Sequence, residues 1–348
     1  MGEIISHPER KVPRNKHPGT KYHSLKIMNK RLASVDSLRG FLTVLVVLGH
    51  VAVGLKDCGY YKGSDKVLVS NLYHLIYSFH MPVFFAISGY LYGEKRITTL
   101  KALGNSLRHR LFTLGIPYLL CSLLYWCIKY ALTFLVEAPV RVQDLLWIPL
   151  KPIEFFWYLY ALLVIYILAD VIGYFYGNKV VLCLLFLAVA FFYHGPKSSY
   201  GLEKAIPYIG FFYLGCVLRK YQDKIRVLSI SGILFFSVAY FYLNKRSWEL
   251  KFLLAVLGTI FLIQFFSKIK KENLLSLIGQ RAMPIYVLHV ILVGGIRILL
   301  LRSGIKHLSI HFLLGFFIPL AACYWGYDII KRIPLLDFCF YPGKYRKL

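Results

Sequence analysis

Long runs of apolar residues constrain this chain more than any other feature of its sequence. Residues 155–176 and 250–267 carry almost no charge, and each run approaches the roughly 20 residues that a helix needs to cross a bilayer. Hydrophobic residues make up 58% of the chain. In lipid, only helices and closed barrels satisfy every backbone hydrogen bond, and these runs lack the alternation of barrel strands. The sequence therefore predicts an all-α, polytopic transmembrane helix bundle in a lipid bilayer.

The predicted spans also give a topology. When they are threaded alternately across the membrane, most of the 42 Lys and Arg residues fall on the side of the N-terminus. Because cytoplasmic loops are enriched in Lys and Arg, both termini are predicted to be cytoplasmic. The predicted domains are a basic tail over 1–35, a transmembrane domain over 36–332 and a short C-terminal tail over 333–348. The ten predicted spans are 36–55, 71–93, 111–136, 154–176, 179–193, 204–219, 227–243, 250–267, 282–301 and 309–330.

The net charge of +26 raises nucleic-acid binding as an alternative, because basic patches bind phosphates. The Lys and Arg residues are nevertheless scattered through the loops between apolar helices and form no basic domain. We interpret them as topology signals, and no nucleic-acid partner is predicted. The seven cysteines show no metal-ligand spacing such as CxxC. Neither a metal site nor a disulfide framework is predicted.

The first span carries polar side chains that are costly in lipid and therefore indicate a functional site. Arg39 and His50 are eleven residues apart, so they project from one face of a helix and are separated by roughly 16 Å along its axis. In the predicted topology, Arg39 lies at the cytoplasmic mouth, where Asp36 can pair with it. His50 lies in the outer half. The alternatives are that Arg39 snorkels to lipid phosphates and that His50 only bonds a neighbouring helix.

The second span carries another histidine, His80, at a depth compatible with that of His50. Pro82 can kink this helix and open space beside His80. Ser88 and Gly89 permit close approach of a neighbouring helix. Two histidines in the outer halves of adjacent spans exceed what helix packing alone leads us to expect.

Three blocks of residues resemble those of the acyltransferase-3 family of integral membrane acyltransferases. The first is DSLRG at 36–40, from which Arg39 and His50 form the family's Arg-x10-His pattern. The second is FHMPVFFAISG at 79–89, and the third is GQRAMPIYVLH at 279–289. The order of the blocks and the length of the hydrophobic region also resemble the family.

The resemblance implies an enzyme that transfers an acyl group, usually acetyl from acetyl-CoA, to a hydroxyl of a cell-surface or lipid-linked glycan. It implies no permanently bound cofactor, with acetyl-CoA as the donor substrate. Among family members, the chain is most similar to the stand-alone sugar O-acetylases, including fucose 4-O-acetylase-like proteins. The implied location is the bacterial inner (cytoplasmic) membrane. Ala282 stands where a serine is common, so the role of that serine is not carried over.

The resemblance also implies roles for individual residues. His50 would act as a general base or as a transient acyl acceptor, and His80 would orient or replace it. Direct transfer and an acyl-histidine relay both stay open. The candidate residues for binding the polyanionic donor are Asp36, Arg39, Arg96, Arg108, Arg110, Ser88, Tyr286 and His289. The enrichment of cytoplasmic loops in Lys and Arg accounts equally well for the arginines at 96, 108 and 110. For Tyr286 and His289, in the inner half of their helix, packing in the protein core is the alternative role.

On the acceptor side, Glu154 and Trp157 are candidates for holding the sugar, although aromatic residues at this depth are commonly interface anchors. Arg297 has two glycines nearby and is predicted to face a cavity, without an assigned role. The competing function is a transporter or flippase for a lipid-linked glycan or small anion. Transporters usually carry internal repeats, and no repeat is detected in this sequence. The acceptor sugar and the oligomeric state are left open.

Overall fold

The computed structural model describes residues 18–93, 95–131, 140–193, 201–222, 224 and 227–345. Within these ranges all regular structure is helical, which confirms the predicted all-α class. The elements are α1 (Pro18–Asp57), α2 (Gly63–Tyr92), α3 (Leu100–Arg110), η1 (Leu111–Gly115), α4 (Ile116–Ala131), α5 (Asp144–Trp147), η2 (Glu154–Phe156), α6 (Trp157–Phe175), α7 (Lys179–Phe192), α8 (Gly201–Lys220), α9 (Leu228–Lys245), α10 (Trp248–Ser267), α11 (Leu274–Gln280), α12 (Ala282–Arg302), α13 (Leu308–Ile330), α14 (Pro334–Phe340) and η3 (Pro342–Tyr345).

Every predicted span corresponds to a helix in the described ranges. Nine helical stretches there are long and apolar enough to cross a membrane, and α7, with 14 residues, is a shorter apolar helix. Helix α1 begins well before the predicted span at 36, although its apolar part runs over Ala33–Asp57. Helix α2 likewise starts earlier than predicted, at Gly63. Residues 1–17 of the predicted N-terminal tail and 132–136 of the third span lie outside the described residues.

Contacts between helices show that α6 and α8 both run parallel to α2. Along α6, Tyr158 lies beside Phe84 and Tyr166 donates a hydrogen bond to the carbonyl of Ser88. Helix α8 stacks Tyr208 on Phe85 and, further along, passes Gly89 with its own backbone. Helix α7 connects these two parallel helices, so it must return across the bundle despite its length. The directions of α2, α6, α7 and α8 therefore agree with the alternation that the sequence predicted.

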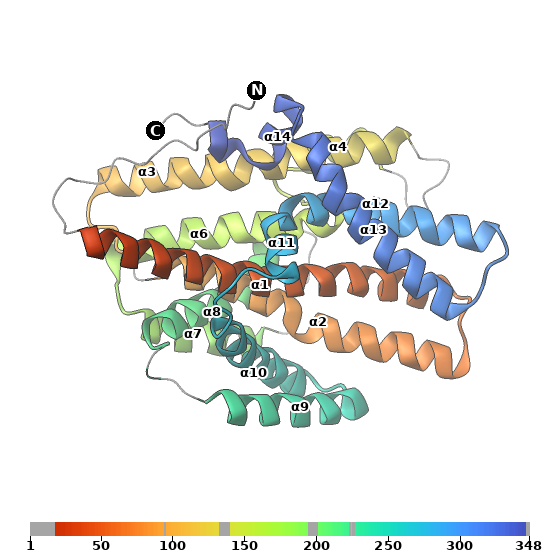
Figure 1. The fold of residues 1–348 in the computed structure, drawn as a ribbon, viewed down its shortest axis with the longest axis horizontal. Coiled ribbons are helices and arrows are strands. Elements are labelled where there is room, and N and C mark those ends of the chain that lie inside the picture. The colour runs from red at the N-terminus through yellow and green to blue at the C-terminus, as the bar shows by residue number, and fades with distance from the viewer. Residues whose placement is uncertain are drawn as a thin grey trace.

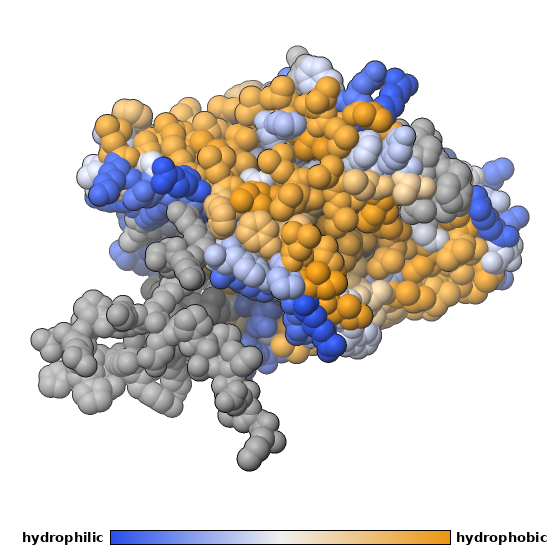
Figure 2. All heavy atoms as spheres, turned by 90° about the horizontal axis from the view of Figure 1, so that it is seen from above, coloured by the Kyte–Doolittle hydropathy of each residue, from blue (hydrophilic) through white to orange (hydrophobic). Residues whose placement is uncertain are grey.

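The outer surface of the bundle is apolar. Phe236 and Phe241 of α9 and Phe317 and Trp325 of α13 all expose more than half of their surface. Figure 2 shows a broad band of apolar side chains across the middle of one face, with hydrophilic residues gathered toward its margins. A surface of this kind is stable in lipid and not in water. The chain is an integral membrane protein that crosses the bilayer several times.

Two glycine contacts draw the central helices together. A Cβ atom at Gly40 of α1 would lie 1.8 Å from the carbonyl oxygen of Leu275, and one at Gly279 of α11 would lie 1.8 Å from that of Asp36. Only glycine allows backbones to approach so closely. Ser37 adds a 3.1 Å hydrogen bond to Asn273, the N-cap of α11. Figure 1 shows α1 through the middle of the bundle with α11 beside it.

Candidate active site

One cavity of about 760 Å³ is lined by helices that come from distant parts of the sequence. It runs along the face of α1 that carries Arg39 and His50, so the predicted alignment of these two side chains is present. Its polar and charged lining residues are Asp36, Arg39, Thr43, His50, Tyr77, His80, Ser88, Arg110, Thr113, Glu154, Tyr158, Tyr166, Gln280, Tyr286 and Tyr341.

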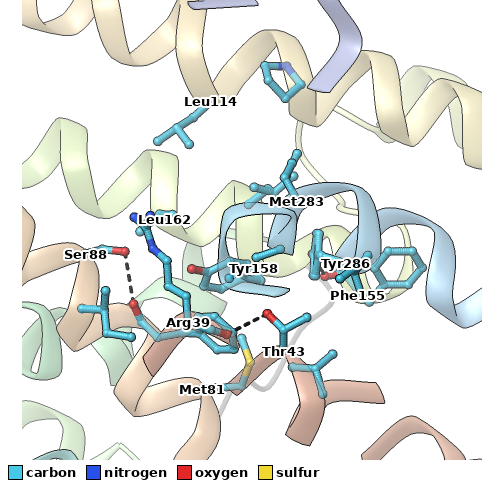
Figure 3. Close-up of a pocket in the computed structure, with 18 of the residues that line it drawn as sticks. Arg39, Thr43, Met81, Ser88, Leu114, Phe155, Tyr158, Leu162, Met283 and Tyr286 are labelled. Atoms are coloured by element: carbon cyan, nitrogen blue, oxygen red, sulfur yellow. Dashed lines mark hydrogen bonds between the residues drawn. The ribbon is translucent and has the colours of Figure 1, made fainter. Parts of the chain in front are cut away.

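The end of the cavity nearer the start of α1 is cationic. Arg39 Nη1 lies 3.6 Å from Asp36 Oδ1, as the three-residue spacing predicted, and Figure 3 shows the Arg39 side chain extending toward Leu162 of α6. Arg110 stacks its guanidinium 4.0 Å from the ring centre of Tyr166 and donates to Asp170 Oδ2 over 3.5 Å. Two arginines from separate helices therefore line one end of the cavity.

Arg96 and Arg108 do not reach this cavity. Both side chains are exposed, and neither lines it. The reason for Arg108 is helical geometry, because residues two positions apart on α3 point roughly 200° apart, so Arg110 faces the bundle and Arg108 faces away. Lys95 instead reaches the buried carboxylate of Asp170, at 3.3 Å.

Three histidines gather toward the other end. His50 and His80 line the cavity, and the ring of His289 lies 4.9 Å from that of His50, edge to face. His80 Nδ1 donates to the carbonyl oxygen of Ile76 over 2.6 Å. The Tyr77 ring stands 4.9 Å from the His80 ring and 6.4 Å from the His50 ring. The two predicted catalytic histidines therefore share one chamber, with a third packed against it.

His289 lies deeper than its position in the sequence suggested. It is fully buried and does not line the cavity itself. Its Nδ1 donates to backbone carbonyl oxygens of α12, and its Nε2 has no hydrogen-bond partner among the residues that the structure describes. A signal for this pairing was present: His50 follows Gly40 by ten residues, and His289 follows Gly279 by ten. Because the two glycines touch, the two histidines meet.

Glu154 lines the cavity in an unusual backbone conformation. Its φ is 43°, a left-handed value that costs free energy for any residue with a Cβ and is often found at functional sites. The carboxylate accepts hydrogen bonds from Tyr125 and Lys129 of α4. The next residue, Phe155, places its ring 6.4 Å from His50. The structure thus brings Glu154 to the histidine end of the cavity.

The remaining predicted residues divide between the cavity and its surroundings. Trp157 lines the cavity and stacks on Tyr208. Ser88 also lines it, with Oγ donating to the Phe84 carbonyl oxygen over 3.1 Å. Tyr286 lines it and donates its hydroxyl hydrogen bond to the Phe155 carbonyl oxygen. Arg297 lies outside the cavity, where its Nη1 donates to the Gly54 carbonyl oxygen over 2.6 Å.

Sequence reasoning missed several lining residues. Tyr77 and Tyr158 are hidden among the many aromatic residues of their helices, where a lipid or core contact is the usual role. Gln280 and Tyr341 lie outside the long apolar spans. In this chain no local pattern distinguishes a lining aromatic residue from a packing one, because the difference depends on which helices stand opposite.

The model of the acyltransferase-3 family, described as an acyltransferase domain, matches residues 32–328. The nodulation protein NolL of Mesorhizobium japonicum is 32% identical over 144 residues, which cover 41% of this chain and 36% of that protein. A nodulation protein NolL of Sinorhizobium fredii is 38% identical over 101 residues, covering 28% and 24% respectively.

The chain spans only about a third and a quarter of the lengths of these two curated relatives. No solved structure matches it. The family match, by contrast, covers most of the chain and includes all three blocks, the glycine contacts and the three gathered histidines. The chain therefore belongs to the acyltransferase-3 family of integral membrane acyltransferases.

Proposed function

We propose that this enzyme is an O-acetyltransferase that moves an acetyl group from acetyl-CoA to a hydroxyl of a cell-surface or lipid-linked glycan. The observation that carries the proposal is the shape of the cavity, which has arginines at one end and histidines at the other. A nucleotide thioester has the same polarity, with phosphates at one end and a reactive carbonyl at the other. The donor therefore lies along the cavity with its phosphates at the arginines and its reactive carbonyl at the histidines.

Arg39 and Arg110 hold the donor at the end of the bundle that the charge distribution assigns to the cytoplasm. Guanidinium groups bind phosphate oxygens through paired hydrogen bonds. Asp36 and Asp170 offset part of the cationic charge when no donor is present. The thioester then reaches along α1 toward His50, roughly 16 Å away by helical rise.

His50 supplies the chemistry at the far end. A neutral imidazole takes the proton of the acceptor hydroxyl while the hydroxyl oxygen attacks the thioester carbonyl carbon. The C–S bond then breaks, and the CoA thiolate leaves and takes up the proton, so that the ester and free CoA are formed. In a relay, the imidazole attacks the carbonyl first and passes the acetyl group on. His80 of α2 lines the same chamber, where it orients His50 or replaces it in the proton path.

Glu154 and Trp157 form the acceptor side of the same chamber. The Glu154 carboxylate, held by Tyr125 and Lys129, accepts hydrogen bonds from sugar hydroxyls. Trp157 offers an aromatic face of the kind on which sugar rings pack. Both residues line the cavity, so an acceptor bound there lies beside the thioester carbonyl.

Acetyl transfer by purified protein in lipid nanodiscs tests the proposal, with acetyl-CoA and a glycan acceptor and with thiol release as the readout. We expect His50→Ala to lower kcat by about 100-fold or more, the usual contribution of a general base. His74→Ala is the matched control, since His74 lies on α2 outside the cavity, and it should retain wild-type turnover. Full turnover in the His50 variant would overturn the catalytic assignment.

The transporter alternative predicts a different outcome. Cells that lack this protein would lose export of the glycan, while acetylation of the glycan would be unchanged. The proposed enzyme predicts glycans lighter by one acetyl mass in those cells, with export intact. Mass spectrometry of surface glycans separates the two.

A further inference from the structure

The C-terminal segment over 334–345 folds back against the bundle. It consists of α14 and η3 and lies beyond residue 328, where the family match ends. Figure 1 shows it beside α4 at the top of the molecule. Phe340 at the end of α14 is 3% exposed, in one buried cluster with Cys121 of α4 and Val287 of α12. The segment therefore belongs to the core between these helices.

A buried carboxylate anchors the segment. Asp337 accepts hydrogen bonds from the hydroxyl of Tyr327 at 2.9 Å, from Lys344 Nζ at 2.9 Å and from the hydroxyl of Tyr345 at 3.2 Å. Lys344 Nζ also lies 4.6 Å from the ring centre of Tyr341. A buried acid with three donors, including a charged one, holds a single geometry firmly. The segment is thus a built part of the fold.

Two side chains of this segment line the cavity. Phe340 and Tyr341 complete its wall together with Pro117 at the start of α4 and Met283 of α12. The Tyr341 hydroxyl reaches the carbonyl oxygen of Gln280 over 3.4 Å, which places it at the end of α11, close to where α11 crosses α1. Because Gly279, next to Gln280, contacts the backbone of Asp36 and Gly40, this wall stands close to the arginine end of the cavity. The wall is mainly apolar.

We propose that Phe340 and Tyr341 contact the arm that joins the phosphates of the donor to its thioester and hold that arm in the cavity. The inference rests on the proposed function, because it takes a nucleotide thioester as the donor. The arm of coenzyme A is long and flexible and alternates methylene and methyl groups with two amides, so a mainly apolar wall beside the phosphate site gives its carbon atoms a surface to pack on.

Donor affinity tests this inference in the full chain in nanodiscs. We expect Phe340→Ala to raise the KM for acetyl-CoA roughly fivefold, as for loss of one buried aromatic contact. Tyr341→Ala should behave similarly. The KM for the glycan acceptor should stay within twofold. Leu335→Ala is the matched control, because Leu335 lies on α14 with 72% of its surface exposed.

An unchanged KM for acetyl-CoA in both variants would overturn the inference, as would a change confined to the acceptor KM. Wild-type protein provides a second test that does not depend on the folding of a variant. Adding coenzyme A should slow hydrogen exchange of the amides over 334–345, and equal exchange with and without it would contradict the proposal. Wild-type protein that binds CoA but acetylates no glycan would refute the proposed function and leave this inference standing.

Discussion

His289 contributes a buried nitrogen beside the proposed base. Because its Nδ1 donates to two backbone carbonyl oxygens, its Nε2 is the acceptor in the neutral ring. Leaving such an atom without a partner costs about 1–3 kcal/mol, which the fold tolerates 4.9 Å from the His50 ring. We infer that His289 is a positioning residue for His50, since its lone pair is available whenever the His50 ring turns an N–H toward it.

Replacing His289 by alanine should lower kcat by about 10-fold, which is less than the roughly 100-fold or more that a general base contributes directly. The KM for acetyl-CoA should stay within twofold, because His289 lies outside the cavity. The pH dependence of kcat should also shift, since His50 loses its neighbour. Pre-steady-state and steady-state rates over a pH series measure these effects.

His289→Gln is the conservative control, because its amide restores a polar atom at this position and should recover part of the turnover. A merely structural role predicts something else. It would lower turnover equally at every pH and would reduce the melting temperature of the protein.

Among the helices, α11 sets the position of α12 along the bundle axis relative to α1. Asn273 and Ser276 form a capping box that starts α11, and the chain restarts as α12 after Arg281. Close contact of Gly279 with the backbone of Asp36 then fixes α12 against α1. This contact brings His289 level with His50. A short helix of seven residues therefore decides the geometry of the histidine end.

Gly279→Ala should destabilise the protein by about 1–3 kcal/mol, the cost of overpacking a close contact. Its Cβ would lie 1.8 Å from the Asp36 carbonyl oxygen, so α11 must move away from α1. We expect lower turnover and a lower melting temperature in detergent. Gly294→Ala is the control on α12, where an added Cβ meets nothing within 4 Å. Equal melting temperatures for the two variants would contradict this account of the helix crossing.

At the scale of the whole molecule, the chain passes back and forth through the bundle and returns to the end where it started. Arg281, which follows α11, lies 2.7 Å from Asp328 near the end of α13, and α11 in turn packs on the start of the apolar part of α1. The short helix α7 completes this alternation. The charge distribution then predicts that this end faces the cytoplasm.

Single cysteines in a cysteine-free background test the orientation. Lys62→Cys and Lys306→Cys should react with a membrane-impermeant maleimide added to intact cells, because both exposed positions lie at the end of the bundle opposite Arg39. Lys271→Cys and Arg332→Cys, which are also exposed, should react only after the membrane is opened. The reverse labelling pattern would place the arginine end outside the cell and exclude cytosolic acetyl-CoA as the donor.

Much of this architecture follows from the sequence because its causes are local. Lipid requires helices of a given length, so the apolar runs alone determined the all-α class and the positions of the spans. The spacing of Arg39 and His50 placed both on one helix face, where the cavity now lies. The family resemblance, carried by three short blocks, was confirmed over residues 32–328.

What only the tertiary structure decided depends on contacts between distant residues. Arg108 and Arg110 look alike in the sequence, yet packing turns only Arg110 into the cavity. His289 became a neighbour of His50 because two glycines let α11 approach α1. Phe340 and Tyr341, in what the sequence presented as a tail, became a wall of the cavity. Hydropathy determines which segments enter the membrane, but side-chain shape and close backbone contacts determine which residues meet there.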